Sequence, residues 1–426
     1  MSKNILNALP ELVREGLLSD DSAQKINAYY KIKEQQQPQR MNIVFGIIGS
    51  ALVGLGIILI VAHNWDNFSR PVKIIFSFLP LIVGQIFCGY SLIKKQDNRT
   101  WKESSATFLF FAVGASIALV AQVYNIPGNL GSFLFTWMLL CVPLIYIMPS
   151  SMVSLLCIIG ITAYAVEDGY GYRAANHYHY WWLIVLVIPH YLMRIKKYPG
   201  SNFTFFHHWF LPISLTICLA TLAAGAEEYI IIAYISLFGA FYLLGTSAWL
   251  NFKRIISNGY LIIGSLGTMG ILLALSFKWF WTGLNDNDDP LTIQVIMSII
   301  FTTSLAVFFL FINNKNRAEP SVNLMGFIFV LFPVIFFIGL SAPLMGVILM
   351  NLLVLAAAIF TMQRGLALNH LGILNYGLLI IAVLVICRFF DTNISFVIRG
   401  LLFVAVGAGF FFANSQLIKK RKQHEV

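Results

Sequence analysis

The chain has 426 residues, a formal net charge of +10, 58% hydrophobic residues and only 11% charged residues. The Lys and Arg are scattered over many short segments, which excludes a concentrated nucleic-acid-binding surface. No long polar run follows the first 40 residues. The composition therefore excludes a large soluble domain and predicts an all-α transmembrane helix bundle.

Residues 1–40 predict a short cytoplasmic helical hairpin. Leucines recur at helical spacing up to Gly16, which is placed to end a first helix, and Ser19 with Asp20 and Asp21 forms a cap and first turn for a second. This hairpin either docks on a protein partner or on the inner face of the bundle, or it lies on the membrane surface before the first span.

Residues 41–417 predict a transmembrane bundle of about fourteen spans. A span needs about 20 mostly apolar residues. Such stretches lie near 43–63, 71–93, 105–123, 131–148, 150–166, 180–193, 206–224, 229–250, 257–277, 291–312, 321–339, 342–362, 369–387 and 395–413. The stretches at 150–166 and 180–193 are the shortest, so the count depends most on them.

The basic residues predict the orientation of the spans. With the N-terminus inside, 22 of the 28 Lys and Arg fall on the inner side, including the tail at 418–426. Because Lys and Arg in short loops are retained in the cytoplasm, we expect both termini inside. The five cysteines all lie in apolar stretches, without the spacing of a metal site or a disulfide framework.

Two sequence elements resemble a known family. The first span contains Gly46-Ile-Ile-Gly49-Ser-Ala-Leu-Val-Gly54-Leu-Gly56, continues to Ala62-His63-Asn64-Trp65-Asp66 and is followed by Arg70-Pro71-Val-Lys73. The third span leads into Ala121-Gln122-Val-Tyr124-Asn125-Ile-Pro127-Gly128. Both are similar to recurring elements of the bacterial membrane-protein family named domain of unknown function 2157 (DUF2157), over roughly residues 5–150. Near the end, Asp391-Thr-Asn-Ile-Ser-Phe-Val-Ile-Arg399-Gly400 also resembles such proteins. The resemblance implies a bacterial inner-membrane protein and no particular reaction.

Glycines in the first span indicate close helix packing. Gly49, Gly54 and Gly56 place small residues along one side of the helix, so a second helix can approach backbone to backbone. We expect this span in the centre of the bundle.

Polar residues within spans are candidate functional residues because each is costly in hydrocarbon. They are Gln85, Gln122, His190, Asn351, Asn375 and Arg399. No Asp or Glu lies in the middle of a span, so the carboxylate relay of many proton-coupled transporters is missing. Gln122, Tyr124 and Asn375 are the candidate residues of a polar cavity. A water-reachable cavity among the first, third, thirteenth and fourteenth spans, with Gln122 and Arg399 on its wall, would be the most informative structural observation.

Arg399 also predicts a polar cluster at the outer face. It lies about one turn into the last span, where an arginine needs a partner or must extend to the headgroups. Asp391 and Asp66 are the candidate partners.

The outer loop between the fifth and sixth spans contains His177, His179 and many aromatic residues. Two histidines are too few for a metal site, and an interfacial aromatic belt explains the pattern more simply. No catalytic elbow, phosphate loop or dinucleotide fingerprint occurs, so we expect no catalytic residues, no metal and no cofactor.

Three classes of function fit these patterns. The first is a transporter or flippase for a small molecule or lipid, and the second is a non-catalytic protein that assembles with or regulates others. The third, less favoured, is a lipid-modifying enzyme using Asp66, His177, His179 or Asp391. Beyond the lipid bilayer, the expected partners are a small-molecule or lipid substrate and a protein at the N-terminal hairpin, with no nucleic acid.

Overall fold

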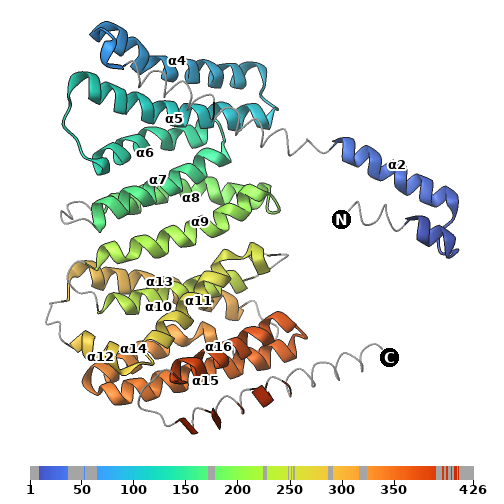
Figure 1. Ribbon diagram of the computed structural model, residues 1–426, viewed down its shortest axis with the longest axis vertical. Helices are drawn as coiled ribbons and strands as arrows, with labels where there is room; N and C mark the ends of the chain where they lie inside the picture. Colours follow the sequence, from blue (N-terminus) through green and yellow to red (C-terminus); the bar gives the residue numbers. More distant parts are fainter. Residues whose placement is uncertain are drawn as a thin grey trace. The chain divides into compact units, whose positions relative to one another are not determined.

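The computed structural model describes residues 9–36, 52, 65–170, 178–223, 228–247, 249–250, 252, 255–285, 291–315, 324–389, 396–397, 400–401, 404, 407–409 and 411. Within these residues the chain forms helices and turns and no β-strand. Internal contacts divide the chain into two compact units, residues 1–126 and residues 127–426. Each unit is described by itself (Figure 1).

The first unit begins with two short helical segments. Residues 9–14 are helical, and Gly16 adopts a φ of +71°, the left-handed conformation that favours glycine at a helix end. Helix α2 (Asp20–Gln36) follows, and the Ser19 side chain accepts a hydrogen bond from the Ser22 amide at 3.4 Å. The helix boundaries thus lie where the sequence places them, while the cytoplasmic side remains a prediction.

Helices α4 (Arg70–Lys94) and α5 (Arg99–Tyr124) form an antiparallel pair that follows the short helix η1 (Trp65–Asn67). Asn98 caps α5 by accepting from the Trp101 amide at 3.1 Å. Gly84 makes the close approach possible: a Cβ there would lie 3.2 Å from the Leu109 Cα. The two helices run side by side in Figure 1.

The second unit opens with four consecutive helices, of which α7 contacts the other three. They are α6 (Leu130–Ile147), α7 (Ser151–Gly169), α8 (His179–Lys197) and α9 (Asn202–Leu219). Helices α6, α7 and α9 begin at side-chain caps, provided by Asn129, Ser150 and Ser201. These caps explain why the helices restart so soon after one another.

The rest of the second unit packs around α10 (Ile230–Thr246), in which 13 of 17 residues are buried. Helices α11 (Gly259–Ala274), α13 (Ile293–Lys315) and α14 (Ile328–Ser341) contact it. Helices α15 (Pro343–Ala367) and α16 (Leu371–Phe389) form an antiparallel pair beside α11, and α12 (Lys278–Asn285) is short. Small 3-10 helices complete the described elements: η2 (Ala220–Leu222), η3 (Ile255–Ser257) and η4 (Leu324–Gly326).

Eight of the described helices are long and apolar enough to cross a membrane. They are α4, α5, α6, α7, α9 extended by η2, α13, α15 and α16, and the bent pair α11 and α12 provides a ninth if it is one span. Helices α10 and α14 are apolar but shorter, and α8 ends with three basic residues. The multi-span helical character is confirmed. The count of about fourteen and the N-in/C-in topology stay predictions, since the first and last stretches lie largely outside the described residues.

Candidate binding pocket and broken helix

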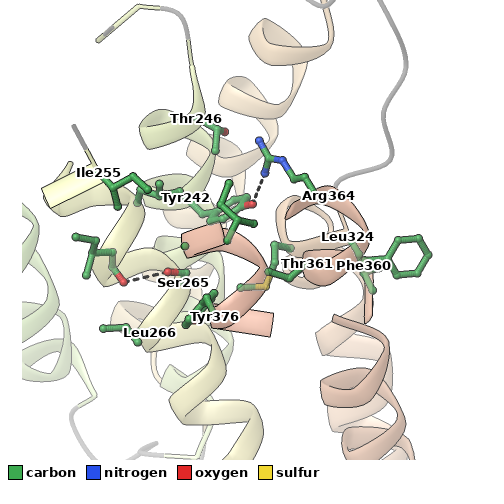
Figure 2. Close-up of a pocket in the computed structure, with 15 residues that line it drawn as sticks. Tyr242, Thr246, Ile255, Ser265, Leu266, Leu324, Phe360, Thr361, Arg364 and Tyr376 are labelled. Atoms are coloured by element: carbon green, nitrogen blue, oxygen red, sulfur yellow. Dashed lines mark hydrogen bonds between the residues drawn. The ribbon is translucent and has the colours of Figure 1, made fainter. Parts of the chain in front are cut away.

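A cavity of about 330 Å³ lies in the second unit, at one end of helices α10, α11, α15 and α16 (Figure 2). The end of α10, the start of α11, the last turns of α15 and the first turns of α16 all contribute to its wall. Residues of η3 and η4 complete it. This volume lies in the range of about 300–1,000 Å³ typical of small-molecule sites.

Arg364 is the charged residue of this pocket. Its Nη1 donates a hydrogen bond of 2.7 Å to the Tyr242 hydroxyl on α10. Among the described residues, no carboxylate lies within 4.0 Å of the guanidinium. The ion pairs found there join Lys25 to Asp21 and Arg99 to Glu103 and do not involve Arg364. Arg364 also lies in the last turn of α15, where the helix dipole favours a cation.

Besides Tyr242, four hydroxyl side chains line the same cavity: Thr246, Ser265, Thr361 and Tyr376. Thr361 and Ser265 donate to carbonyls of their own helices, Ala357 O at 2.7 Å and Ile262 O at 3.2 Å. The buried Tyr376 hydroxyl lies beside Ser265. The remaining wall is mostly aliphatic, so the pocket combines one cation and a few hydroxyls with an apolar surface.

Close helix packing brings these side chains to one cavity. On α15 and α16, Cβ atoms added at Gly365 and Gly377 would lie 2.5 Å from Leu374 N and 2.9 Å from Ala358 O. The two backbones are therefore in direct contact, which turns Arg364 and Tyr376 toward the same space. Asn258 fixes the start of α11 by accepting from the Leu261 amide and donating to Gly245 O on α10.

The opposite end of α11 is a broken helix. The chain bends by 86° between α11 and α12, which removes the helical partners of the last carbonyls. Trp281 replaces one partner, since its Nε1 donates to Leu275 O at 2.8 Å. Asn351 on α15 replaces another, donating to Ser276 O at 3.2 Å.

Arg388 on α16 completes this arrangement. Its Nη2 donates to Ser276 Oγ at 3.1 Å, and its guanidinium carbon lies 4.4 Å from the centre of the Phe277 ring. We call Ser276, Phe277, Asn351 and Arg388 the Ser276 latch. It joins the broken helix to both α15 and α16 at the end remote from Arg364.

The pocket and the Ser276 latch are thus at opposite ends of the same three helices. Leu261 lines the pocket near the start of α11, and Ser276 of the latch lies fifteen residues further along the chain, just after α11 ends. At 1.5 Å per residue this separation is about 22 Å, most of the hydrocarbon thickness.

A third polar feature connects α7, α8, α9 and α11. The His207 Nε2 and Ser154 Oγ are 2.9 Å apart, and the His208 Nδ1 and Tyr191 hydroxyl are 2.6 Å apart. Tyr260 on α11 donates to the same Tyr191 hydroxyl at 3.0 Å. All five side chains are buried. We call these residues the histidine network.

The structure places the predicted polar residues in different surroundings. Asn351 belongs to the Ser276 latch. Gln122 is exposed near the end of α5, and Tyr124 lies beneath Arg70, whose guanidinium carbon is 5.0 Å from the ring centre. Asn375 is exposed, whereas its neighbour Tyr376 lines the pocket. The predicted cavity residues therefore do not line this pocket.

Other predicted residues lie outside the part of the chain that the structure describes. This group comprises Gly49, Gly54, Gly56, His177, Asp391 and Arg399, together with the side chain of Asp66. The outer polar cluster and the central packing of the first span therefore stay predictions.

His190 and His179 are buried or packed among aromatic rings. His190 is 3% exposed. The His179 Nδ1 lies 3.1 Å from the Tyr164 hydroxyl, and its ring centre is 4.7 Å from that of Phe135. In the described ranges no group of three or more His, Cys, Asp or Glu is arranged to hold a metal ion.

Sequence reasoning missed Arg364, Tyr242 and Arg388 as site residues. In the sequence, Arg364 and Arg388 contribute only to the charge pattern that predicts the orientation, and nothing distinguishes Tyr242 within the apolar stretch 229–250. Helical spacing of Thr361 and Arg364 could have placed both on one face of α15. Their partner on α10 lies 122 residues away in sequence, and no local pattern points to it.

Residues 10–154 match the model of a family described as predicted membrane protein (DUF2157). This confirms the family resemblance of the first third of the chain. No curated protein and no solved structure matches the chain.

Proposed function

We propose that this chain, whose residues 10–154 match a family of predicted membrane proteins, is a carrier that moves a lipid-like molecule across the bacterial inner membrane. One observation supports this proposal above the others. Helices α11, α15 and α16 enclose a pocket at one end and a broken, bridged helix at the other. Transporters commonly contain interrupted helices whose ends change partners during transport, and here the break lies at the end of α11 opposite the pocket.

In this proposal the structure corresponds to a state open on one side only. By the predicted topology the Arg364 end faces the cytoplasm and the Ser276 latch faces outward. The latch closes the outer end because Asn351 and Arg388 tie the break in α11 to both neighbouring helices. Transport then requires these hydrogen bonds to open while the Arg364 end closes.

A reconstitution experiment tests the proposal. Purified protein is placed in liposomes containing fluorescent single-chain and two-chain lipids, and a membrane-impermeant reductant bleaches the outer leaflet. For at least one lipid, we expect the reductant to bleach more than the outer-leaflet fraction. This additional bleaching should disappear in Ile373→Trp, because the larger side chain fills the pocket. Gly270→Ala is the matched control, because a Cβ there meets nothing within 4 Å. Folded wild-type protein that moves none of these lipids faster than empty liposomes contradicts the proposal.

The second candidate, an assembly or regulatory role, has its own supporting observation. Leu17 and Tyr29, next to and within α2, are 73% and 58% exposed in the structure. Such apolar side chains suit a protein partner at the N-terminal hairpin. A variant that lacks residues 1–36 is tested in the same liposomes. If it moves lipid at the wild-type rate, the N-terminal hairpin is not needed for transport and its role is a separate one.

A further inference from the structure

We infer that the Arg364 pocket binds a single-chain amphiphile with an anionic headgroup. This inference rests on the proposed carrier function and names its substrate class. The headgroup, a carboxylate or a phosphate, contacts Arg364, and the chain lies against the aliphatic wall.

The charge of Arg364 supports an anionic headgroup. A guanidinium has five N–H donors, and the hydrogen bond to Tyr242 uses one of them. No described carboxylate is within ion-pair distance. Carboxylates and phosphates match the planar geometry of arginine with two parallel hydrogen bonds. A cationic headgroup would instead meet uncompensated repulsion.

The hydroxyls of the pocket contribute less to the binding of this headgroup than Arg364 does. Thr361 and Ser265 already donate to backbone carbonyls, so their oxygens offer mainly acceptor positions. Tyr376 supplies a buried hydroxyl on the facing helix. An anion needs donors, and Arg364 is the strongest donor that lines the cavity.

Cavity size and lining indicate one chain. The volume of about 330 Å³ is near the lower limit for small-molecule sites, which is too small for a two-chain lipid held entirely inside. Leu261, Ile262 and Ile373 supply apolar wall from two helices. Because lipid tails are as apolar as these side chains, the contact between the headgroup and Arg364 decides the affinity.

Binding of four ten-carbon probes to protein in nanodiscs of zwitterionic lipid tests the inference. Decanoate and decyl phosphate carry the two anionic headgroups, decyl maltoside is neutral and decyltrimethylammonium is cationic. We expect saturable binding of the anionic probes, one per chain, with at least tenfold weaker binding of the other two. The ratio between decanoate and decyl phosphate distinguishes the two headgroup chemistries.

Variants locate the site. Arg364→Gln should weaken the anionic probes at least tenfold, and Arg364→Lys should retain part of the affinity because it keeps the charge. Lys196→Gln, which removes an exposed cation at the end of α8, should leave binding unchanged. Ile373→Trp should prevent binding of every probe. Size-exclusion profile and thermal stability confirm that each variant is folded.

The possible results separate the two proposals. Equal affinity for all four probes, with no effect of Arg364→Gln, overturns the anionic class while the pocket remains a binding site. Binding that survives Ile373→Trp, or the absence of saturable binding, overturns the pocket as the site. Anionic binding without lipid movement in liposomes leaves the ligand class standing and contradicts the carrier function.

Discussion

The histidine network and the Arg364 pocket place polar groups in the same membrane bundle in opposite ways. In the network, buried polar side chains from four helices form hydrogen bonds with one another. In the pocket, Arg364 donates one hydrogen bond to a protein group, the Tyr242 hydroxyl, and lines a cavity of about 330 Å³. Since polar groups in hydrocarbon stabilise a bundle only when satisfied, this difference fits a structural role for the network and the proposed binding role for the pocket.

The largest expected effect is on the packing that creates the pocket. Gly264→Val on α11 would place a Cβ 2.6 Å from Phe238 O and from Tyr242 N, which are backbone atoms of α10 and cannot rotate away. We expect a loss of about 3 kcal/mol or more in stability, because the two helices must separate. Gly270→Val, on the same helix, meets open space and should be close to neutral.

Thermal stability of both variants in detergent, followed by fluorescence size-exclusion chromatography, measures this effect. Equal stability of the Gly264 and Gly270 variants would mean that α10 and α11 do not pack as described.

The next effect is on the histidine network. His207→Ala leaves the Ser154 hydroxyl without its partner and removes a large buried ring. We expect destabilisation of about 1–3 kcal/mol from the lost hydrogen bonding alone. Arg364→Gln should change stability by about 0.5 kcal/mol or less, since little protein contact depends on it.

Chemical or thermal unfolding of these two variants compares the network with the pocket directly. A greater loss in Arg364→Gln than in His207→Ala would reverse the roles assigned to the two regions.

A smaller effect is expected at the Ser276 latch. Arg388→Gln removes the guanidinium that donates to Ser276 Oγ and covers the Phe277 ring. We expect little change in overall stability and a several-fold faster reaction of Phe277→Cys with a thiol reagent, because the break in α11 opens more often. Lys278→Gln, an adjacent charge change, is the control for altered reagent attraction.

Reaction rates in a cysteine-free background provide the measurement. If Phe277→Cys reacts equally fast with and without Arg388, the latch does not restrain the broken helix.

The smallest effect on the protein is expected from single cysteines in the loops, whose labelling tests the orientation of the spans. Single cysteines at Lys95 and Lys196 should be protected from an impermeant thiol reagent added outside intact cells, whereas one at Asn125 should react. Outside labelling at Lys196 would show that the region 150–193 has been miscounted.

Much of the helical architecture was predictable because its signals are local. Apolar length predicted a helix at each stretch within the described residues, and Gly16 and Ser19 marked helix ends by their own conformational preferences. The break at Ser276 was not predicted, because the stretch 257–277 is apolar up to the bend and α12 continues with Trp279 and Trp281.

The candidate site was less predictable because it depends on contacts between distant segments. Asn351 was singled out by its cost in hydrocarbon, and it does bridge the broken helix. Asn375 was singled out for the same reason, yet the helix turns Tyr376 to the pocket instead. A one-residue difference is 100° on a helix, and only the packing of α16 on α15 fixes which face is inside.

The most direct test of the carrier account measures the side from which the pocket is reached. A cysteine at Ile373, in a cysteine-free background, is treated with an impermeant thiol reagent in right-side-out and in inside-out membrane vesicles. The account predicts fast labelling from the cytoplasmic side, slow labelling from outside, and faster outside labelling when Arg388→Gln weakens the latch. Equal labelling from both sides in the wild-type background, or outside labelling that Arg388→Gln leaves unchanged, would contradict it.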